Sequence, residues 1–324
     1  MDRDGDGDRG ALMDQEIPRP VDQRLGRVHL RQRVGIEREH EARVAARRPG
    51  LFRMRRVPVM RALVHATLWM SGLHGRAARN AARVVLRRNE VPSPRLPARF
   101  DGFTLLHLSD LHADISAGAM RRVAELVAGR RYDVCVLTGD YRGRTYGACD
   151  AALEAMAQLR RHLTAPLYGV LGNHDSLAMA SAMEQMGIRM LMNECVTIAR
   201  GDQAIWLAGV DDANFFRLQN IELAAAAIPD AGYAILLSHT PEIYRQAAHA
   251  GFDLMLSGHT HGGQICLPGG IPVLLGGRLP RRVAAGAWRH QAMSGYTSTG
   301  AGSSVVPLRL NCPPEITLHS LRRV

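Results

Sequence analysis

From residue 103 onward, short apolar runs alternate with segments that have the 3.6-residue period of amphipathic helices. The runs are bounded by Gly, Asn, Asp and Pro, as buried strands commonly are. We therefore expect strands at residues 104–108, 134–138, 167–171, 204–210, 234–238, 252–256, 264–267, 292–298 and 315–320. Helices are expected at residues 117–128, 151–163, 177–186 and 241–248. This alternation is typical of a layered α/β domain.

Polar residues follow five of these predicted strands at the point where each strand ends. They are Asp110 and His112, Gly139-Asp140, Gly172-Asn173-His174-Asp175, Ser238-His239, and Gly258-His259-Thr260-His261. Each group by itself has an ordinary explanation as a turn or a helix cap. In open α/β sheets, however, ligands bind beyond the carboxyl ends of the strands. Five such groups of carboxylate, amide and imidazole donors favour one shared metal site.

The order and spacing of these five groups resemble the motifs of the calcineurin-like metallophosphoesterase family, over about residues 103–321. Two further stretches are similar to a subgroup of bacterial, often membrane-associated phosphodiesterases of the YaeI/YkuE type. They are Gly262-Gly263-Gln264 and Asn311-Cys312-Pro313-Pro314-Glu315. The resemblance implies an α/β fold, a four-layer αββα sandwich of two mixed β-sheets with the metal site at the strand C-terminal ends.

The resemblance also implies a dinuclear centre that holds two divalent ions, with Mn, Fe and Zn as candidates. One ion would be held by Asp110, His112 and His261, and the other by Asn173, His239 and His259. Asp140 would bridge the two ions. His174 would be catalytic and give a proton to the leaving oxygen, with Asp175 orienting its ring.

These residues imply a metal-dependent phosphoric ester hydrolase, a phosphodiesterase or pyrophosphohydrolase that uses a metal-bound hydroxide. A lipid or sugar-nucleotide substrate at the membrane is expected, and the pyrophosphate bond of UDP-diacylglucosamine is one example. An alternative is a cytosolic nucleotide or cyclic-nucleotide phosphodiesterase. A non-catalytic binding scaffold is a further alternative, which the complete ligand set argues against.

The first 100 residues hold 22 of the 41 basic residues and 11 of the 30 acidic ones, which accounts for the whole formal charge of +11. The chain contains no lysine, so that codon bias can explain the large number of arginines. The positive charge is therefore not taken as evidence for nucleic-acid binding, and nucleic acid is not an expected partner. Residues 1–56 have no sustained apolar period and are expected to form a disordered or loosely helical Arg-rich extension. One hypothesis is that translation starts downstream, at Met54 or Met60.

Residues 57–73 form the one long apolar stretch, but Arg61 and His65 interrupt it, and it is shorter than the ~20 residues that span a bilayer. An amphipathic helix is expected here, either packed on the domain or in peripheral contact with a membrane through residues 53–79. A strand at residues 83–88 and a Pro-rich linker would complete residues 57–100 and lead into a metallophosphoesterase domain at residues 101–324.

The chain has five cysteines and no Cys-x-x-Cys pair, which argues against a disulfide framework and a zinc ribbon. Together these features predict a location in the cytoplasm or at the cytoplasmic face of the inner membrane.

Overall fold

Two six-stranded β-sheets form the body of the protein in a computed structural model that describes residues 20–46, 56–273 and 279–324. The first sheet has the order β1 (Val85–Ser93), β14 (Glu315–Arg323), β2 (Thr104–Leu108), β3 (Val134–Leu137), β4 (Leu167–Gly169) and β5 (Ile188–Met190). The second has the order β12 (Gly286–His290), β13 (Met293–Thr297), β9 (Leu254–Ser257), β8 (Tyr233–Leu237), β7 (Gln203–Gly209) and β6 (Glu194–Arg200). A small hairpin joins β10 (Cys266–Leu267) to β11 (Ile271–Pro272).

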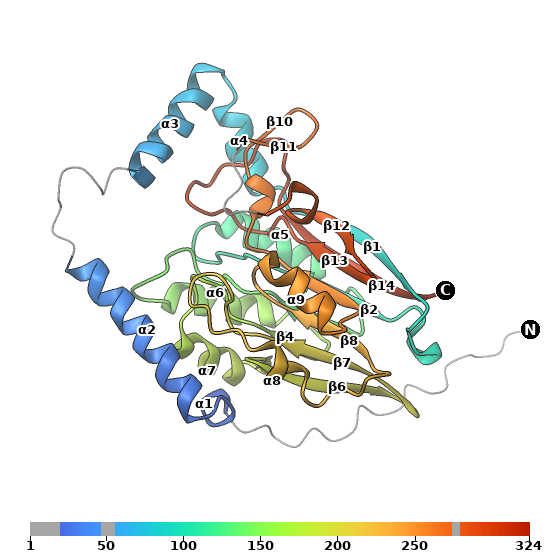
Figure 1. Ribbon diagram of the computed structural model, residues 1–324. Coiled ribbons are helices and arrows are strands. Elements are labelled where there is room, and N and C mark those ends of the chain that lie inside the picture. The colour runs from blue at the N-terminus through green and yellow to red at the C-terminus, as the bar shows by residue number, and fades with distance from the viewer. Residues whose placement is uncertain (1–19, 47–55, 274–278) are drawn as a thin grey trace, which may run out of the picture.

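Helices cover the outer face of each sheet (Figure 1). Three pack on the first sheet: α5 (Ala117–Val127), α6 (Asp150–Arg160) and α7 (Leu177–Gln185). On the second sheet lie α8 (Ile221–Ala225), α9 (Tyr244–His249) and the 3₁₀ helix η2 (Pro241–Ile243). Further 3₁₀ helices are η1 (Ala98–Phe100), η3 (His261–Gly263) and η4 (Arg281–Val283).

An apolar layer between the two sheets holds them together. Alternate strand residues, such as Leu105 and Val136 from the first sheet and Ile235 and Leu256 from the second, are fully buried in this layer. Their neighbours, such as Leu106, point to the outer helices instead. The predicted four-layer αββα sandwich of two mixed sheets is therefore confirmed.

The central strands run parallel and bring their carboxyl ends to one edge. In the first sheet β2 pairs with β3 and β3 with β4, all in parallel. In the second, β7 pairs with β8 and β8 with β9 in the same way. The loops after β2, β3, β4, β8 and β9 are those that carry the polar groups found in the sequence, so that these groups are brought together.

The strand expected at residues 83–88 is present, but it begins later, extends into the expected Pro-rich linker and belongs to the first sheet, which moves the boundary of the domain. Strand β1 extends from Val85 to Ser93 and pairs in parallel with β14. It includes Pro92, which an edge strand tolerates because one side of its backbone has no neighbour to bond.

The apolar stretch forms α3 (Arg56–Met70), followed by α4 (His74–Ala81). In the part of α3 whose side chains are described, Leu68 is buried in a cluster with Ala77, Val306 and Leu308, so that the helix packs on the domain. Trp69 and other apolar side chains of α3 remain exposed, which is not the one-sided pattern expected of an amphipathic helix. Among the described residues no helix combines the length and the apolar character that crossing a membrane requires.

Residues 20–46 are helical, which corrects the expectation of disorder for this part of the N-terminal extension and agrees with the helical alternative. They form α1 (Val21–Arg24) and α2 (Arg27–Ala45), and α2 lies along the side of the molecule next to α7 (Figure 1). Residues 1–19 and 47–55 lie outside the described residues. Apolar contacts hold these helices in part, since Val21 and Leu25 are buried in the core of the first sheet and Leu30 and Val34 pack against it.

Buried ion pairs and hydrogen bonds fasten these two helices to the domain. The Arg24 guanidinium lies 2.7 Å from the Glu184 carboxylate and 3.0 Å from that of Glu194. Arg33 is fully buried, with its Nη1 2.6 Å from Asp211 Oδ1, and it donates from Nη2 to the Asp175 carbonyl oxygen at 2.8 Å. Burial alone would raise the pKa of Asp211, but the Arg33 charge lowers it below its usual value.

We expect Arg33→Met to lower the free energy of unfolding by about 3 kcal/mol, because the buried Asp211 carboxylate loses its guanidinium partner. Among the described residues, it would keep only the His29 ring, 2.8 Å from its Oδ2, and the N–H group of Asp212. The contribution of the pair is present above the unfolded-state pKa of about 3.9 and is lost as the pH falls through the lowered folded-state pKa. Urea unfolding at pH 7 and near pH 3 measures both effects. Arg31→Met, at an exposed position of the same helix, is the control, and an equally small change in both variants would contradict the prediction.

Candidate metal centre

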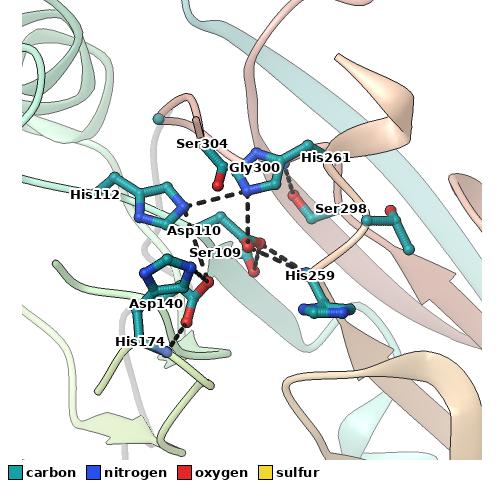
Figure 2. Close-up of polar contacts among 12 residues, drawn as sticks. Ser109, Asp110, His112, Asp140, His174, His259, His261, Ser298, Gly300 and Ser304 are labelled. Carbon is teal, nitrogen blue, oxygen red and sulfur yellow. Dashed lines mark hydrogen bonds and ion pairs between the residues drawn. The ribbon is translucent and has the colours of Figure 1, made fainter. Parts of the chain in front are cut away.

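The loops after five strands bring the predicted site residues into one cluster (Figure 2). The members are Asp110 and His112 after β2, Asp140 after β3, Asn173 and His174 after β4, His239 after β8, and His259 and His261 after β9. Both carboxylates and three of the imidazoles, those of His112, His239 and His261, are buried. All eight of these residues come from the motifs that the sequence analysis identified.

Five residues of the cluster have left-handed backbone conformations, which are uncommon outside glycine. The φ angles are 48° for Asp110, 39° for His112, 57° for Asp140, 71° for His259 and 50° for His261. Such conformations persist where the surrounding structure enforces them, and they concentrate at functional sites. Here they occur in the loops that carry the donors.

One group of donors is formed by Asp110, His112 and His261. The Nε2 atoms of the two histidines are 3.2 Å apart, and His261 Nε2 lies 3.4 Å from Asp110 Oδ1. The three donor atoms lie within 4.8 Å of one another. Two imidazoles and a carboxylate at this spacing form a donor set that fits a divalent transition metal.

A second group surrounds Asp140. Its Oδ2 lies 3.4 Å from His239 Nε2 and 3.8 Å from His112 Nε2, so that it lies between the two groups. His239 Nε2 is also 3.0 Å from Asn173 Oδ1 and 3.2 Å from His259 Nδ1. Donors of the types found here, a carboxylate, an amide oxygen and imidazoles, fit a second divalent ion.

Outer contacts fix the orientation of the ligand rings. His112 Nδ1 lies 2.8 Å from the Arg142 carbonyl oxygen, and His239 Nδ1 lies 2.7 Å from the Thr138 carbonyl oxygen. Each carbonyl oxygen accepts a hydrogen bond from the Nδ1–H group, so that Nε2 of each ring faces the centre. His261 differs, because its Nδ1 lies 3.1 Å from Nη2 of the buried Arg309.

Burial and the neighbouring charges shift the pKa values in this cluster, downward for Asp140 and His261 and upward for His239. Burial alone would raise the pKa of Asp140, but His239 and His174 lower it well below its usual range. Burial, and then the Arg309 charge, lower the pKa of His261 well below its usual value. Burial alone would lower the pKa of His239, but the Asp140 charge raises it well above its usual value. An ionised Asp140 is the form that binds a cation.

Asp175 has a different role from the one expected, since its carboxylate supports the backbone of the site. It accepts hydrogen bonds from the N–H groups of Asp140 at 2.7 Å, Gly172 at 2.8 Å and Tyr141 at 2.9 Å. The partner of the His174 ring is the Thr145 hydroxyl, 3.3 Å from Nδ1. The expectation that Asp175 orients this ring is therefore corrected, because its oxygens are occupied by the loop that carries Asp140.

Two arginines complete the site and were missed by sequence reasoning. Arg142 is buried and donates to the carbonyl oxygens of His174 at 2.6 Å and Thr145 at 2.6 Å. Arg309 is fully buried and donates to the His261 carbonyl oxygen at 3.1 Å. Neither belongs to one of the five motifs, and among many arginines no local pattern distinguishes them.

Two hollows flank the cluster. The first is a groove of about 260 Å³ with a mainly apolar lining that includes His261, Val64, Ile265, Val305 and Val306. The second, of about 570 Å³, is more polar, and it is lined by Asn173, His259, Asn214, Phe215, Phe216 and Arg217 and by Ile36, Glu39, His40 and Arg43 of α2. The loop at residues 214–216 thus lines a cleft next to two candidate ligands.

Comparison with known proteins identifies the family. The family model described as calcineurin-like phosphoesterase matches residues 103–263. The chain is 31% identical over 239 residues to the uncharacterized metallophosphoesterase YkoQ of Bacillus subtilis (strain 168), which covers 70% of this chain and 86% of that protein. It is 28% identical over 236 residues to phosphodiesterase YaeI of Escherichia coli (strain K12), covering 68% of this chain and 82% of YaeI.

The chain belongs to the calcineurin-like phosphoesterase family, as its motifs predicted. It is a metal-dependent phosphoric ester hydrolase that carries candidate metal-binding residues at the shared edge of its two sheets.

We expect Asp175→Ala to lower the free energy of unfolding by at least about 2 kcal/mol, because three buried backbone N–H groups lose their acceptor. Asp114→Ala is the matched control, since its exposed carboxylate accepts one N–H group, that of Gly143 at 2.7 Å. Urea unfolding followed by circular dichroism measures both variants. Equal effects would show that the Asp175 contacts add no stability beyond that of an exposed turn.

Proposed function

We propose that this protein hydrolyses phosphodiester or pyrophosphate bonds with two divalent ions, one held by Asp110, His112 and His261 and the other by Asn173, His239 and His259. Asp140 would contact both ions. The observation that carries the proposal is the convergence of these seven donors from five strand ends on one buried cluster. Mn, Fe and Zn remain the candidate metals, because mixed nitrogen and oxygen ligands select weakly among them.

Two such ions, when bound, supply a lowered pKa for a shared water molecule and polarise the phosphoryl oxygens. The side chains set the charge of the centre. Asp110 and Asp140 offset part of the charge of two divalent ions, and Asn173 adds none. The centre therefore keeps a net positive charge that attracts an anionic phosphate ester.

His174 is the group proposed to give a proton to the leaving oxygen. Its Nε2 lies 3.9 Å from Asp140 Oδ2, and its side chain keeps 19% exposure at the mouth of the cluster. The Thr145 hydroxyl at Nδ1 and the Arg142 bond to the His174 carbonyl oxygen hold the ring and its backbone in place. A held imidazole beside the reacting phosphate suits general acid catalysis.

A lipid portion of the substrate is supported by the apolar groove beside His261. Several large apolar side chains are exposed on elements next to this groove. They are Leu63, Trp69 and Met70 on α3, Leu267 and Ile271 on the β10–β11 hairpin, and Val273 and Val305. Helix α3 and this hairpin lie at the same end of the molecule (Figure 1). Such a gathering suits peripheral contact with a membrane at the cytoplasmic face.

A polar head group is supported by the cleft on the other side of the centre. Arg43, Arg217 and the partly exposed ring of Phe215 line it, and they suit a phosphate and a planar base or sugar. We therefore propose a lipid-linked sugar-nucleotide substrate that crosses the centre from one hollow to the other. The second candidate is a nucleotide or cyclic-nucleotide phosphodiesterase, which would use the polar cleft alone.

We expect His174→Ala to lower kcat by roughly 10²-fold or more on an alkyl phosphodiester, and less on bis-p-nitrophenyl phosphate, whose leaving group needs no proton. Metal content is matched between the proteins before the rates are measured. Asp140→Asn should abolish both activities, and His162→Ala, at an exposed histidine outside the motifs, should change neither. An unchanged rate of His174→Ala on the alkyl ester would remove the general-acid role.

The lipid proposal predicts that Val64→Asn and Val305→Asn each change the preference for a lipid-linked pyrophosphate over bis-p-nitrophenyl phosphate. The ratio of the two kcat/KM values should fall by about fivefold or more, because each substitution removes apolar contact with the lipid portion of the substrate. Val28→Asn, an exposed valine of α2 outside the groove, is the control. The substrates are compared in detergent micelles at equal metal concentration. Preference of the wild-type protein for soluble cyclic nucleotides over every lipid substrate would reject the lipid proposal.

A further inference from the structure

A row of polar side chains crosses the mainly apolar layer between the two sheets and ends at Asp110. Its members are Asn89 on β1, His319 on β14, His107 on β2, Thr138 after β3 and Ser109 after β2. His319, His107 and Thr138 have no exposed surface, and Ser109 has 1%. Buried polar groups in such a layer destabilise a fold unless each of them has a partner.

Each member of the row contacts the next. Asn89 Nδ2 lies 3.0 Å from His319 Nδ1, and His319 Nε2 lies 3.3 Å from His107 Nδ1. His107 Nε2 lies 2.8 Å from Thr138 Oγ1. The Thr138 hydroxyl donates to Ser109 Oγ at 2.7 Å, and the Ser109 hydroxyl donates to Asp110 Oδ2 at 2.5 Å.

The number of protons on each group fixes which atom donates and which accepts in every hydrogen bond of the row. An ionised carboxylate only accepts, so Ser109 uses its one proton on Asp110 and must accept from Thr138. Thr138 then has no proton left for His107, whose Nε2 must therefore donate. A neutral His107 has only a lone pair on Nδ1, so that His319 donates to it from Nε2.

Both histidines are neutral, as this order requires. Burial lowers the pKa of His107 to about 3. Burial, and then the neighbouring His107, lower the pKa of His319 well below its usual value. A single arrangement of protons therefore satisfies all of the groups, from the half-buried Asn89 at the sheet edge to Asp110.

We propose that His107 and His319 are positioning residues that fix the Asp110 carboxylate through Thr138 and Ser109, and thereby set the affinity of the centre for metal. The inference rests on the proposed function, in which Asp110 is a metal ligand. The His107 ring reaches the carboxylate only through two hydroxyl groups, each of which has one proton to give. Loss of the ring frees Thr138 to turn away, and Ser109 then loses the donor that orients it.

The test is direct titration of metal-free protein with Mn²⁺ or Zn²⁺ in a calorimeter, which needs no turnover. His107→Phe should weaken the tighter site by about 10-fold or more, the size found for groups that orient metal ligands. Ser109→Ala should weaken it similarly, and the double variant should weaken it no further than either single variant, because both break one chain. His107→Gln, whose amide can donate to Thr138, should recover most of the affinity.

Ile205→Ala is the matched control for general weakening of the inter-sheet layer, since Ile205 is fully buried there and lies outside the row. It should lower Tm and leave metal affinity within about twofold. The proposal is overturned if His107→Phe lowers Tm without weakening metal binding, as is expected of Ile205→Ala. It is also overturned if the losses of metal affinity caused by His107→Phe and Ser109→Ala multiply in the double variant. Absence of metal binding in the wild-type protein would instead contradict the proposed function.

Discussion

The burial of two carboxylates at the edge shared by both sheets is the constraint on which the rest of the site depends. Asp110 and Asp140 are almost completely shielded from water, and a buried charge destabilises a fold unless cations or N–H donors surround it. Imidazoles from both sheets supply part of that environment, and divalent ions would supply the remainder. Both aspartates have left-handed backbone conformations, which the surrounding structure must enforce.

The support for these carboxylates comes from parts of the chain that do not touch the centre. Asp175 holds the backbone of the Asp140 loop, and the row that begins at His319 holds the Asp110 side chain. Arg33 of α2 reaches the carbonyl oxygen of Asp175, so that an N-terminal helix is joined to the same loop. Rigid ligands therefore depend on contacts between segments far apart in the sequence, which is how protein sites commonly gain precision.

Helix α2 also bears on the kind of substrate proposed, because it lines one side of the second hollow. Without it the second hollow would be an open edge beside Asn173 and His259, whereas with it the hollow is a cleft lined from two sides. The apolar groove lies beside His261 and the polar cleft beside His259 and Asn173, which are different residues of one centre. This asymmetry is the physical basis for proposing a substrate with one apolar and one polar end.

The sequence by itself determined the fold class and the candidate ligands, because strand periodicity is local and Asp110, Asp140 and His259 each follow an apolar run directly. It failed for Arg33 and Arg309, which resemble any other arginine until burial and long-range partners distinguish them. Only the tertiary structure decided the role of Asp175, the pairing of β1 with β14 at the sheet edge and the row through His107. These features depend on contacts between residues tens to hundreds of positions apart, and no local pattern records such contacts.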